Sequence, residues 1–127
     1  MTTVFLRVDE VLALHARMIE RYGGEGGVRD FGALGSALSM PQAGFGGELM
    51  HPSLHEQAAA YLFHIVKKHP FVDGNKRVAL TTALVFLELN DAPIAATEDA
   101  LVELTVGAAD GSVSKADVAV FFRAHSV

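Results

Sequence analysis

The chain has 127 residues and a formal net charge of −5, 50% of its residues are hydrophobic, and it contains no cysteine. This length suits one domain, residues 1–127, and the lack of cysteine excludes disulfides and thiolate metal sites. The acidic charge disfavours a whole-surface nucleic-acid binder, so no direct nucleic-acid partner is expected. Neither a secretory signal nor an apolar run long enough for a bilayer is evident, so we expect a cytoplasmic protein with no membrane partner.

Apolar periodicity and helix-capping residues predict an all-α domain. The expected helices, with their N-caps, cover about residues 9–21, 30–39, 53–68, 75–89, 97–108 and 114–124. Pro41 is expected to end the second helix. The glycine-rich stretch between Pro41 and Pro52 is expected to form a small flap, which could be a short hairpin.

The segment His69-Pro-Phe-Val-Asp-Gly-Asn-Lys-Arg77 combines an imidazole, a carboxylate, a glycine, an amide and two cations at the start of an apolar helix. A helix N-terminus offers unpaired N–H groups and partial positive charge, which favour phosphate. His69 could act as a general base and Asp73 as a magnesium ligand. Lys76 and Arg77 lie in the first turn, where cations oppose the helix dipole, so a bound anion is the simpler explanation for them. The segment indicates phosphate-transfer chemistry on a nucleotide.

Structural alternatives exist for the same residues. His69 could be the C-cap of the preceding helix, Asp73 the N-cap of the next, and Asn75 a cap or a phosphate ligand. The two cations could belong to a solvated helix face. The other five histidines are not expected to do chemistry, and His15 and His64 lie in apolar patterns that indicate packing.

The segment resembles the signature loop of the Fic/Doc family, H-x-F-x-D/E-G/A-N-x-R, and fills every specified place. Further segments look like the Doc (death-on-curing) branch of that family, so the resemblance covers nearly the whole chain. These segments are Leu14-His15, Arg21-Tyr22-Gly23-Gly24, Ala79-Leu80 with Phe86-Leu87, and Leu104-Thr105-Val106-Gly107-Ala108-Ala109. The resemblance implies a compact, all-α Fic/Doc-type helical bundle.

The resemblance also implies roles for the residues of the signature segment. His69 would remove the proton from a Ser, Thr or Tyr hydroxyl of a target protein, and Asp73 would bind Mg²⁺, with ATP as the substrate. Phe71 is expected to anchor the loop in the core. The residues expected to hold phosphate are Gly74, Asn75, Lys76 and Arg77, with Lys67 as an additional cation.

Two departures separate this chain from AMP-transferring Fic proteins, which usually carry Gly-Arg-x-x-Arg after the signature asparagine. Lys76 stands in place of the glycine, and Leu80, which cannot hold a γ-phosphate, replaces the second arginine. Both departures match the Doc branch, whose implied reaction transfers the terminal phosphate of ATP to a protein hydroxyl. Transfer of AMP with the same base is the enzymatic alternative. A non-catalytic helical module that uses the basic loop as an anion site is the alternative from another class.

The resemblance implies the toxin of a type II toxin-antitoxin system, which inhibits translation and growth by modifying a target similar to elongation factor Tu. A cognate Phd-like antitoxin would inhibit it in trans, because the chain has no convincing S/T-x-x-x-E-G/N inhibitory motif. The flap could align a target segment by strand addition, with Phe45 as a clamp, or could be a passive connection.

Overall fold

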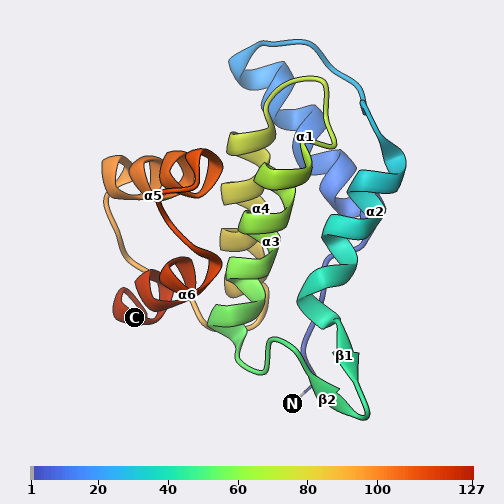
Figure 1. Cartoon of the computed structure of the whole chain (residues 1–127). Coiled ribbons are helices and arrows are strands. Elements are labelled where there is room, and N and C mark those ends of the chain that lie inside the picture. The colour runs from blue at the N-terminus through green and yellow to red at the C-terminus, as the bar shows by residue number, and fades with distance from the viewer. Residues whose placement is uncertain (1) are drawn as a thin grey trace.

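The computed structural model describes residues 2–127 and is built mainly of helices (Figure 1). Its helices are α1 (Val8–Tyr22), α2 (Phe31–Ser39), the 3₁₀ turn η1 (Met40–Gln42), α3 (Leu54–Lys68), α4 (Asn75–Leu89), α5 (Glu98–Asp110) and α6 (Lys115–Ala124). An antiparallel hairpin of β1 (Gly44–Phe45) and β2 (Glu48–Leu49) follows η1. The prediction of an all-helical fold with a small hairpin is confirmed.

Capping side chains start four helices where the sequence predicts them. Each accepts a hydrogen bond from the backbone N–H three residues further on, which satisfies a group that the helix start leaves unpaired. These N-caps are Asp30, Ser53, Thr97 and Ser114. Two details differ from prediction. Helix α2 ends at Ser39, as predicted, but the 3₁₀ turn η1 follows at once and contains Pro41, whose missing N–H is tolerated near the start of a helical turn. Helix α5 continues to Asp110 because Gly111 supplies a left-handed C-cap with φ of 91°.

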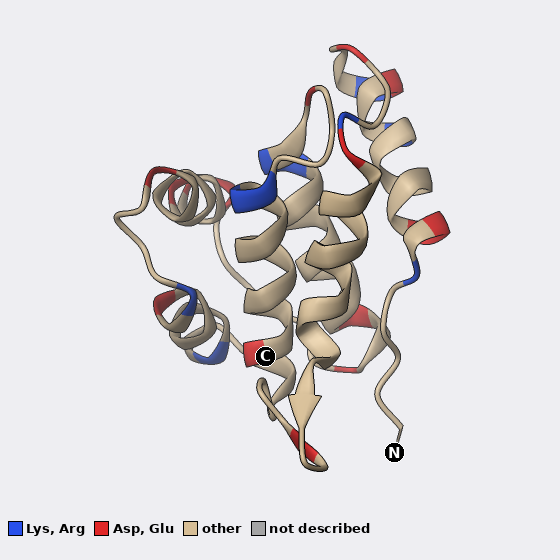
Figure 2. Ribbon diagram, turned by 45° about the vertical axis from the view of Figure 1, so that its right-hand side comes forward, with Lys and Arg blue, Asp and Glu red and all other residues tan. Residues whose placement is uncertain are grey.

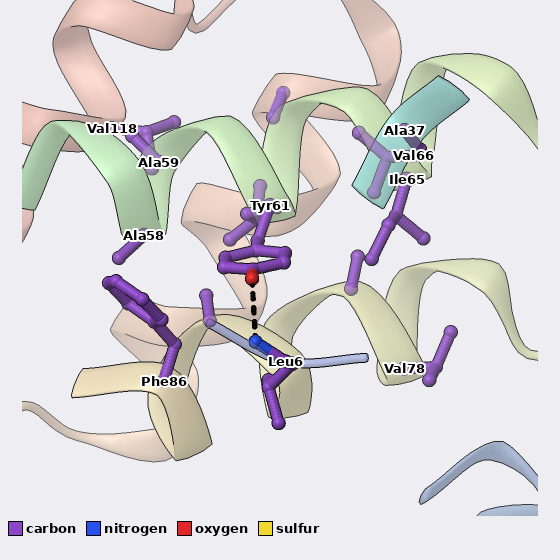
Figure 3. Packing of buried hydrophobic residues seen from close by; sticks show 14 of the residues in the cluster. Leu6, Ala37, Ala58, Ala59, Tyr61, Ile65, Val66, Val78, Phe86 and Val118 are labelled. Atoms are coloured by element: carbon purple, nitrogen blue, oxygen red, sulfur yellow. Dashed lines mark hydrogen bonds between the residues drawn. The ribbon is translucent and has the colours of Figure 1, made fainter. Parts of the chain in front are cut away.

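Helices α3 and α4 form the centre of the fold. Residues 57–66 of α3 and 78–87 of α4 include no Asp, Glu, Lys or Arg, and Figure 2 shows the middle of both helices uncharged. Burial explains this composition, because few charged side chains can be held without a partner in a core. Small residues allow close packing here: Ala58 faces Phe86 of α4, and Ala59 faces Val118 of α6 (Figure 3).

Tyr61 connects the N-terminal segment to this core. Its side chain is fully buried, and its hydroxyl oxygen accepts a hydrogen bond of 2.9 Å from the backbone N–H of Leu6 (Figure 3). Burial raises the pKa of the Tyr61 hydroxyl to about 12. The neutral hydroxyl therefore satisfies a buried backbone donor that would otherwise lack a partner.

The course of α3 separates the two ends of the molecule. Its first residue follows the hairpin, and its last residue precedes the connection to α4, so hairpin and connection lie at opposite ends (Figure 1). A helix of 15 residues spans about 22 Å. Within residues 2–127, no helix is long and apolar enough to cross a membrane.

Candidate active site

The signature segment forms the connection between α3 and α4 together with the first turn of α4. Phe71 is 1% exposed, and its ring stacks on that of His15 from α1, with ring centroids 3.8 Å apart. Nε2 of His15 lies 2.7 Å from the backbone oxygen of Asp73, so this nitrogen donates to the loop. Phe71 thus anchors the loop in the core. His15 packs, as its apolar pattern indicates, and also holds the loop, a contact that the sequence did not reveal.

Asn75 joins the two ends of the connection. It is the first residue of α4 and is 6% exposed. Its Oδ1 accepts a hydrogen bond from the Phe71 N–H, and its Nδ2 donates to the Phe71 carbonyl, both at 2.9 Å. Nδ2 also lies 3.2 Å from Nδ1 of His69. The amide therefore supports the loop and faces the candidate base, while its predicted contact with phosphate stays a prediction.

His69 is the C-cap of α3, with a left-handed backbone (φ 48°, ψ 56°). The helix ends there, before Pro70, as predicted. Arg29 donates hydrogen bonds from Nε to the His69 carbonyl (2.6 Å) and from Nη2 to the Lys68 carbonyl (2.8 Å). Both carbonyls belong to the end of a helix, where backbone oxygens lack helical partners. The sequence gives Arg29 no role, because no neighbouring residue links it to a helix end 40 residues away.

Residues 23–30, here called the glycine strap, lie along the connection between α3 and α4. Val28 of the strap forms an isolated antiparallel bridge with Phe71. Further backbone hydrogen bonds are Arg29 N–H to Pro70 O (2.8 Å), Asp30 N–H to Pro70 O (3.1 Å) and Val72 N–H to Gly27 O (3.1 Å). The strap therefore gives the loop backbone partners that the helices do not supply.

The Asp73 carboxylate is held by two backbone groups. Oδ1 accepts from the Gly74 N–H at 2.8 Å, and Oδ2 accepts from the Glu25 N–H of the glycine strap at 3.2 Å. Gly24 passes so close that a Cβ there would meet Oδ2 at 2.7 Å. The N-cap of α4 is Gly74, so the alternative of Asp73 as N-cap is wrong. Each oxygen accepts one hydrogen bond and keeps lone-pair capacity for a cation.

A cavity of about 690 Å³ opens beside the loop, between α1, α4 and α5. Its polar lining is the run from Asp73 to Arg77 together with Thr81, Glu98 and Thr105, and the ring of Tyr22 borders it. The Arg77 guanidinium lies 4.0 Å from the Tyr22 ring centroid, which orients this cation at the wall. The apolar lining residues are Met18, Ile19, Leu80, Val102 and Val106. The cavity thus combines a charged lining, with the cations Lys76 and Arg77 and the carboxylates Asp73 and Glu98, with apolar side chains.

Two candidates from the sequence lie elsewhere. Nζ of Lys67 is 3.4 Å from the Ala109 carbonyl near the end of α5, and Lys67 does not line the cavity. Phe45 is 94% exposed in the hairpin, at the end of α3 remote from His69 (Figure 1). The structure therefore does not bring either side chain to the loop. His69 does not line the cavity either, but Asn75 contacts its ring and borders the cavity.

Comparisons with known proteins agree with the signature loop. Residues 5–87 match the model of the family described as the Fic/DOC family. The chain is 40% identical over 115 residues to Protein kinase doc of Escherichia phage P1, covering 91% of this chain and 90% of that protein. It is 44% identical over 78 residues to Toxin Doc of Mycolicibacterium smegmatis, covering 61% of this chain and 60% of that protein. The chain therefore belongs to the Fic/Doc family, as the signature loop indicates.

Proposed function

We propose that this protein is a toxin of the Doc type that transfers the γ-phosphate of ATP to a hydroxyl group of a protein. The observation that carries the proposal is that Asn75 contacts the His69 ring and also borders the cavity that Lys76 and Arg77 line. Similarity to a protein kinase over nearly the whole chain supports the same reaction.

The proposed reaction exchanges one phosphorus–oxygen bond for another. The target hydroxyl oxygen bonds to the γ-phosphorus, the bond to the β-phosphate oxygen breaks, and ADP leaves. His69 takes the hydroxyl proton. Such a base contributes about 10²–10⁴-fold in rate, and positioning of the reactants supplies much of the rest.

Lys76, Arg77 and the start of α4 are proposed to bind the phosphates. Both side chains border the cavity within the first turn, where the helix dipole also favours an anion. The guanidinium of Arg77 offers a planar fork of donors, whereas Lys76 offers a mobile point charge. Gly74, with φ of 78°, starts the helix without a side chain between the backbone and the ligand.

Asp73 is the residue proposed to hold Mg²⁺. Within residues 2–127 no group of three acidic or histidine side chains could enclose a metal. A single carboxylate fits magnesium, which commonly takes one or two protein carboxylates and fills its octahedron with water and substrate phosphate. When bound, the ion would neutralise negative charge on the phosphates and orient the terminal group.

The base step places one demand on the His69 ring. A neutral imidazole accepts a proton only on the nitrogen that carries none. The donating amide of Asn75, 3.2 Å from Nδ1, favours the tautomer with its proton on Nε2. Because His69 is exposed, its ring can exchange its proton through water. When the proton moves from Nε2 to Nδ1, the contact with Asn75 is lost and Nε2 is free to accept the hydroxyl proton. The contact with Asn75 is worth about 1 kcal/mol, less than the contribution of the base.

Leu80 favours phosphate transfer over AMP transfer in this proposal. It lines the cavity one turn beyond Lys76, and its side chain offers no charge to a γ-phosphate there. The bulk of Lys76 stands where the AMP-transferring branch has glycine. The terminal phosphate is therefore proposed to lie at the His69 end of the site. The nucleotide would then be placed in the reverse direction to that in the AMP-transferring branch.

The biological setting follows from similarity to the two Doc proteins. We propose that the target is a translation factor similar to elongation factor Tu, that its modification stops growth in the bacterial cytoplasm, and that a cognate Phd-like antitoxin inhibits the protein. The apolar cavity lining beside the cations suits an amphipathic segment of such an inhibitor.

The test uses ATP labelled separately at the α- and γ-phosphates, with purified elongation factor Tu as acceptor. Label should reach the acceptor from the γ position and disappear with His69→Ala, while circular dichroism shows an unchanged fold. Transfer from the α position instead would identify AMP transfer. Growth inhibition that persists with His69→Ala would indicate the non-catalytic binding module.

A further inference from the structure

The backbone of His69 is left-handed, a conformation that is uncommon for any residue with a side chain. Within residues 2–127, His69 and Asp91 are the non-glycine residues with positive φ. A side chain with a Cβ is disfavoured there, and the following Pro70 favours an extended backbone at residue 69. Such a conformation persists where the surroundings hold it, and often does so at functional sites. Contacts outside His69 must therefore determine where its ring points.

Asn75 contacts the ring itself, and Arg29 contacts the backbone that carries it. Its guanidinium spans two consecutive carbonyls, reaching His69 O at 2.6 Å and Lys68 O at 2.8 Å. Its own backbone N–H donates to the Pro70 carbonyl at 2.8 Å. The three bonds fix the residues on both sides of the His69 Cα, so a change in φ or ψ there would break at least one of them.

The charge of Arg29 is directed at this helix end. The ion pairs within residues 2–127 join Arg7 to Asp9 and Glu10, so Arg29 has no carboxylate partner among the described residues. The C-terminal carbonyls of α3 carry partial negative charge, which attracts a cation. A planar fork with several donors matches two adjacent carbonyls better than a lysine ammonium does.

We infer that Arg29 is a positioning residue for His69: from the glycine strap it holds the left-handed end of α3 and so aims the imidazole at the acceptor hydroxyl. This inference rests on the proposed function, in which His69 is the general base. Arg29 does not line the cavity. Its loss should therefore misplace the base while leaving nucleotide binding intact.

The experiment compares Arg29→Met and Arg29→Lys with Arg17→Met, which removes an exposed arginine of α1, in γ-phosphate transfer to purified elongation factor Tu. Arg29→Met should lower kcat by about 10- to 100-fold, because a misplacement of about 1 Å can reduce a rate 100-fold. The KM for ATP and the affinity for ATP measured by calorimetry should stay within about twofold. Arg29→Lys should recover part of kcat, and Arg17→Met should match the wild type.

The outcomes separate this inference from the proposed function. If the wild type transfers phosphate and Arg29→Met keeps kcat within threefold, or loses ATP affinity and thermal stability in proportion to kcat, positioning by Arg29 is refuted and the proposed function stands. If the wild type transfers no phosphate, the proposed function fails. A crystal structure of Arg29→Met then decides whether Arg29 holds the end of α3: a His69 backbone that leaves the left-handed region supports this, and an unchanged φ overturns it.

Discussion

Substitution of alanine at two neighbouring glycines isolates the role of the Asp73 carboxylate. Gly23 and Gly24 both have positive φ (83° and 111°), so alanine is strained at either position, at a cost of about 1–3 kcal/mol in unfolding free energy. Gly23 is also the C-cap of α1, and the two positions differ in what an added Cβ would meet. A Cβ at residue 23 has nothing within 4 Å, whereas a Cβ at residue 24 would meet Asp73 Oδ2 at 2.7 Å and Ile19 Cδ1 at 3.3 Å.

Gly24→Ala should therefore displace the carboxylate and Gly23→Ala should not. Loss of about 1.4 kcal/mol of binding energy at the proposed magnesium ligand corresponds to a tenfold weaker affinity. We expect the Mg²⁺ concentration for half-maximal transfer to rise about tenfold in Gly24→Ala, at saturating ATP.

The assay is a Mg²⁺ titration of phosphate transfer, with urea unfolding of both variants to show that they are folded and similarly destabilised. Gly23→Ala should keep the Mg²⁺ dependence of the wild type. If both variants had the same Mg²⁺ dependence, the inference that Gly24 makes room for a metal-binding carboxylate would be wrong.

Three further predictions concern stability and substrate binding. Burial, with Lys115 at 3.2 Å, lowers the pKa of His64 to about 4 from 6.5, so the unfolded chain binds its proton first as pH falls. Unfolding free energy should therefore decline between pH 6.5 and about 4, by about 1–2 kcal/mol after allowance for solvent screening, and less in His64→Gln; an equal decline in that variant would contradict this. Tyr61→Phe should cost about 1–3 kcal/mol in urea unfolding, because it leaves the Leu6 N–H buried without a partner; a change below 0.5 kcal/mol would argue against that bond. Tyr22→Leu should raise the KM for ATP about two- to fivefold by freeing the Arg77 guanidinium, and an unchanged KM would mean that stacking does not position it.

Local signals made most of the fold predictable. Capping residues and apolar spacing act within one or two turns of a helix. The helix ends expected from sequence therefore lie within two residues of those in the structure. The predicted end of α5 at residue 108 is two residues short, because Asp110-Gly111 has the composition of a turn while Asp110 still belongs to the helix. The sequence also does not show whether the chain leaves the helical conformation at Pro41 or continues as a 3₁₀ turn, because packing decides this.

The site was predictable only in its local part. The run from His69 to Arg77 is contiguous, so its candidate residues could be named from sequence, and the structure places Asp73 to Arg77 along one cavity. Contacts that bridge long separations could not be read: His15 lies 58 residues from Asp73, and Arg29 lies 40 residues from His69. For Lys67 the prediction is wrong in the other direction. The residue is close to the signature segment in sequence, which suggested a shared site, but its side chain points towards α5.

The hairpin offers a site for attaching a label or a surface tether. Its turn, Gly46-Gly47, is exposed, and a Cβ at either glycine would meet nothing within 4 Å. Because α3, about 22 Å long, lies between the hairpin and His69, a fluorophore or surface tether attached at this turn should not obstruct nucleotide, inhibitor or acceptor. Immobilisation through this turn would present the reactive end of every molecule to solution in the same orientation.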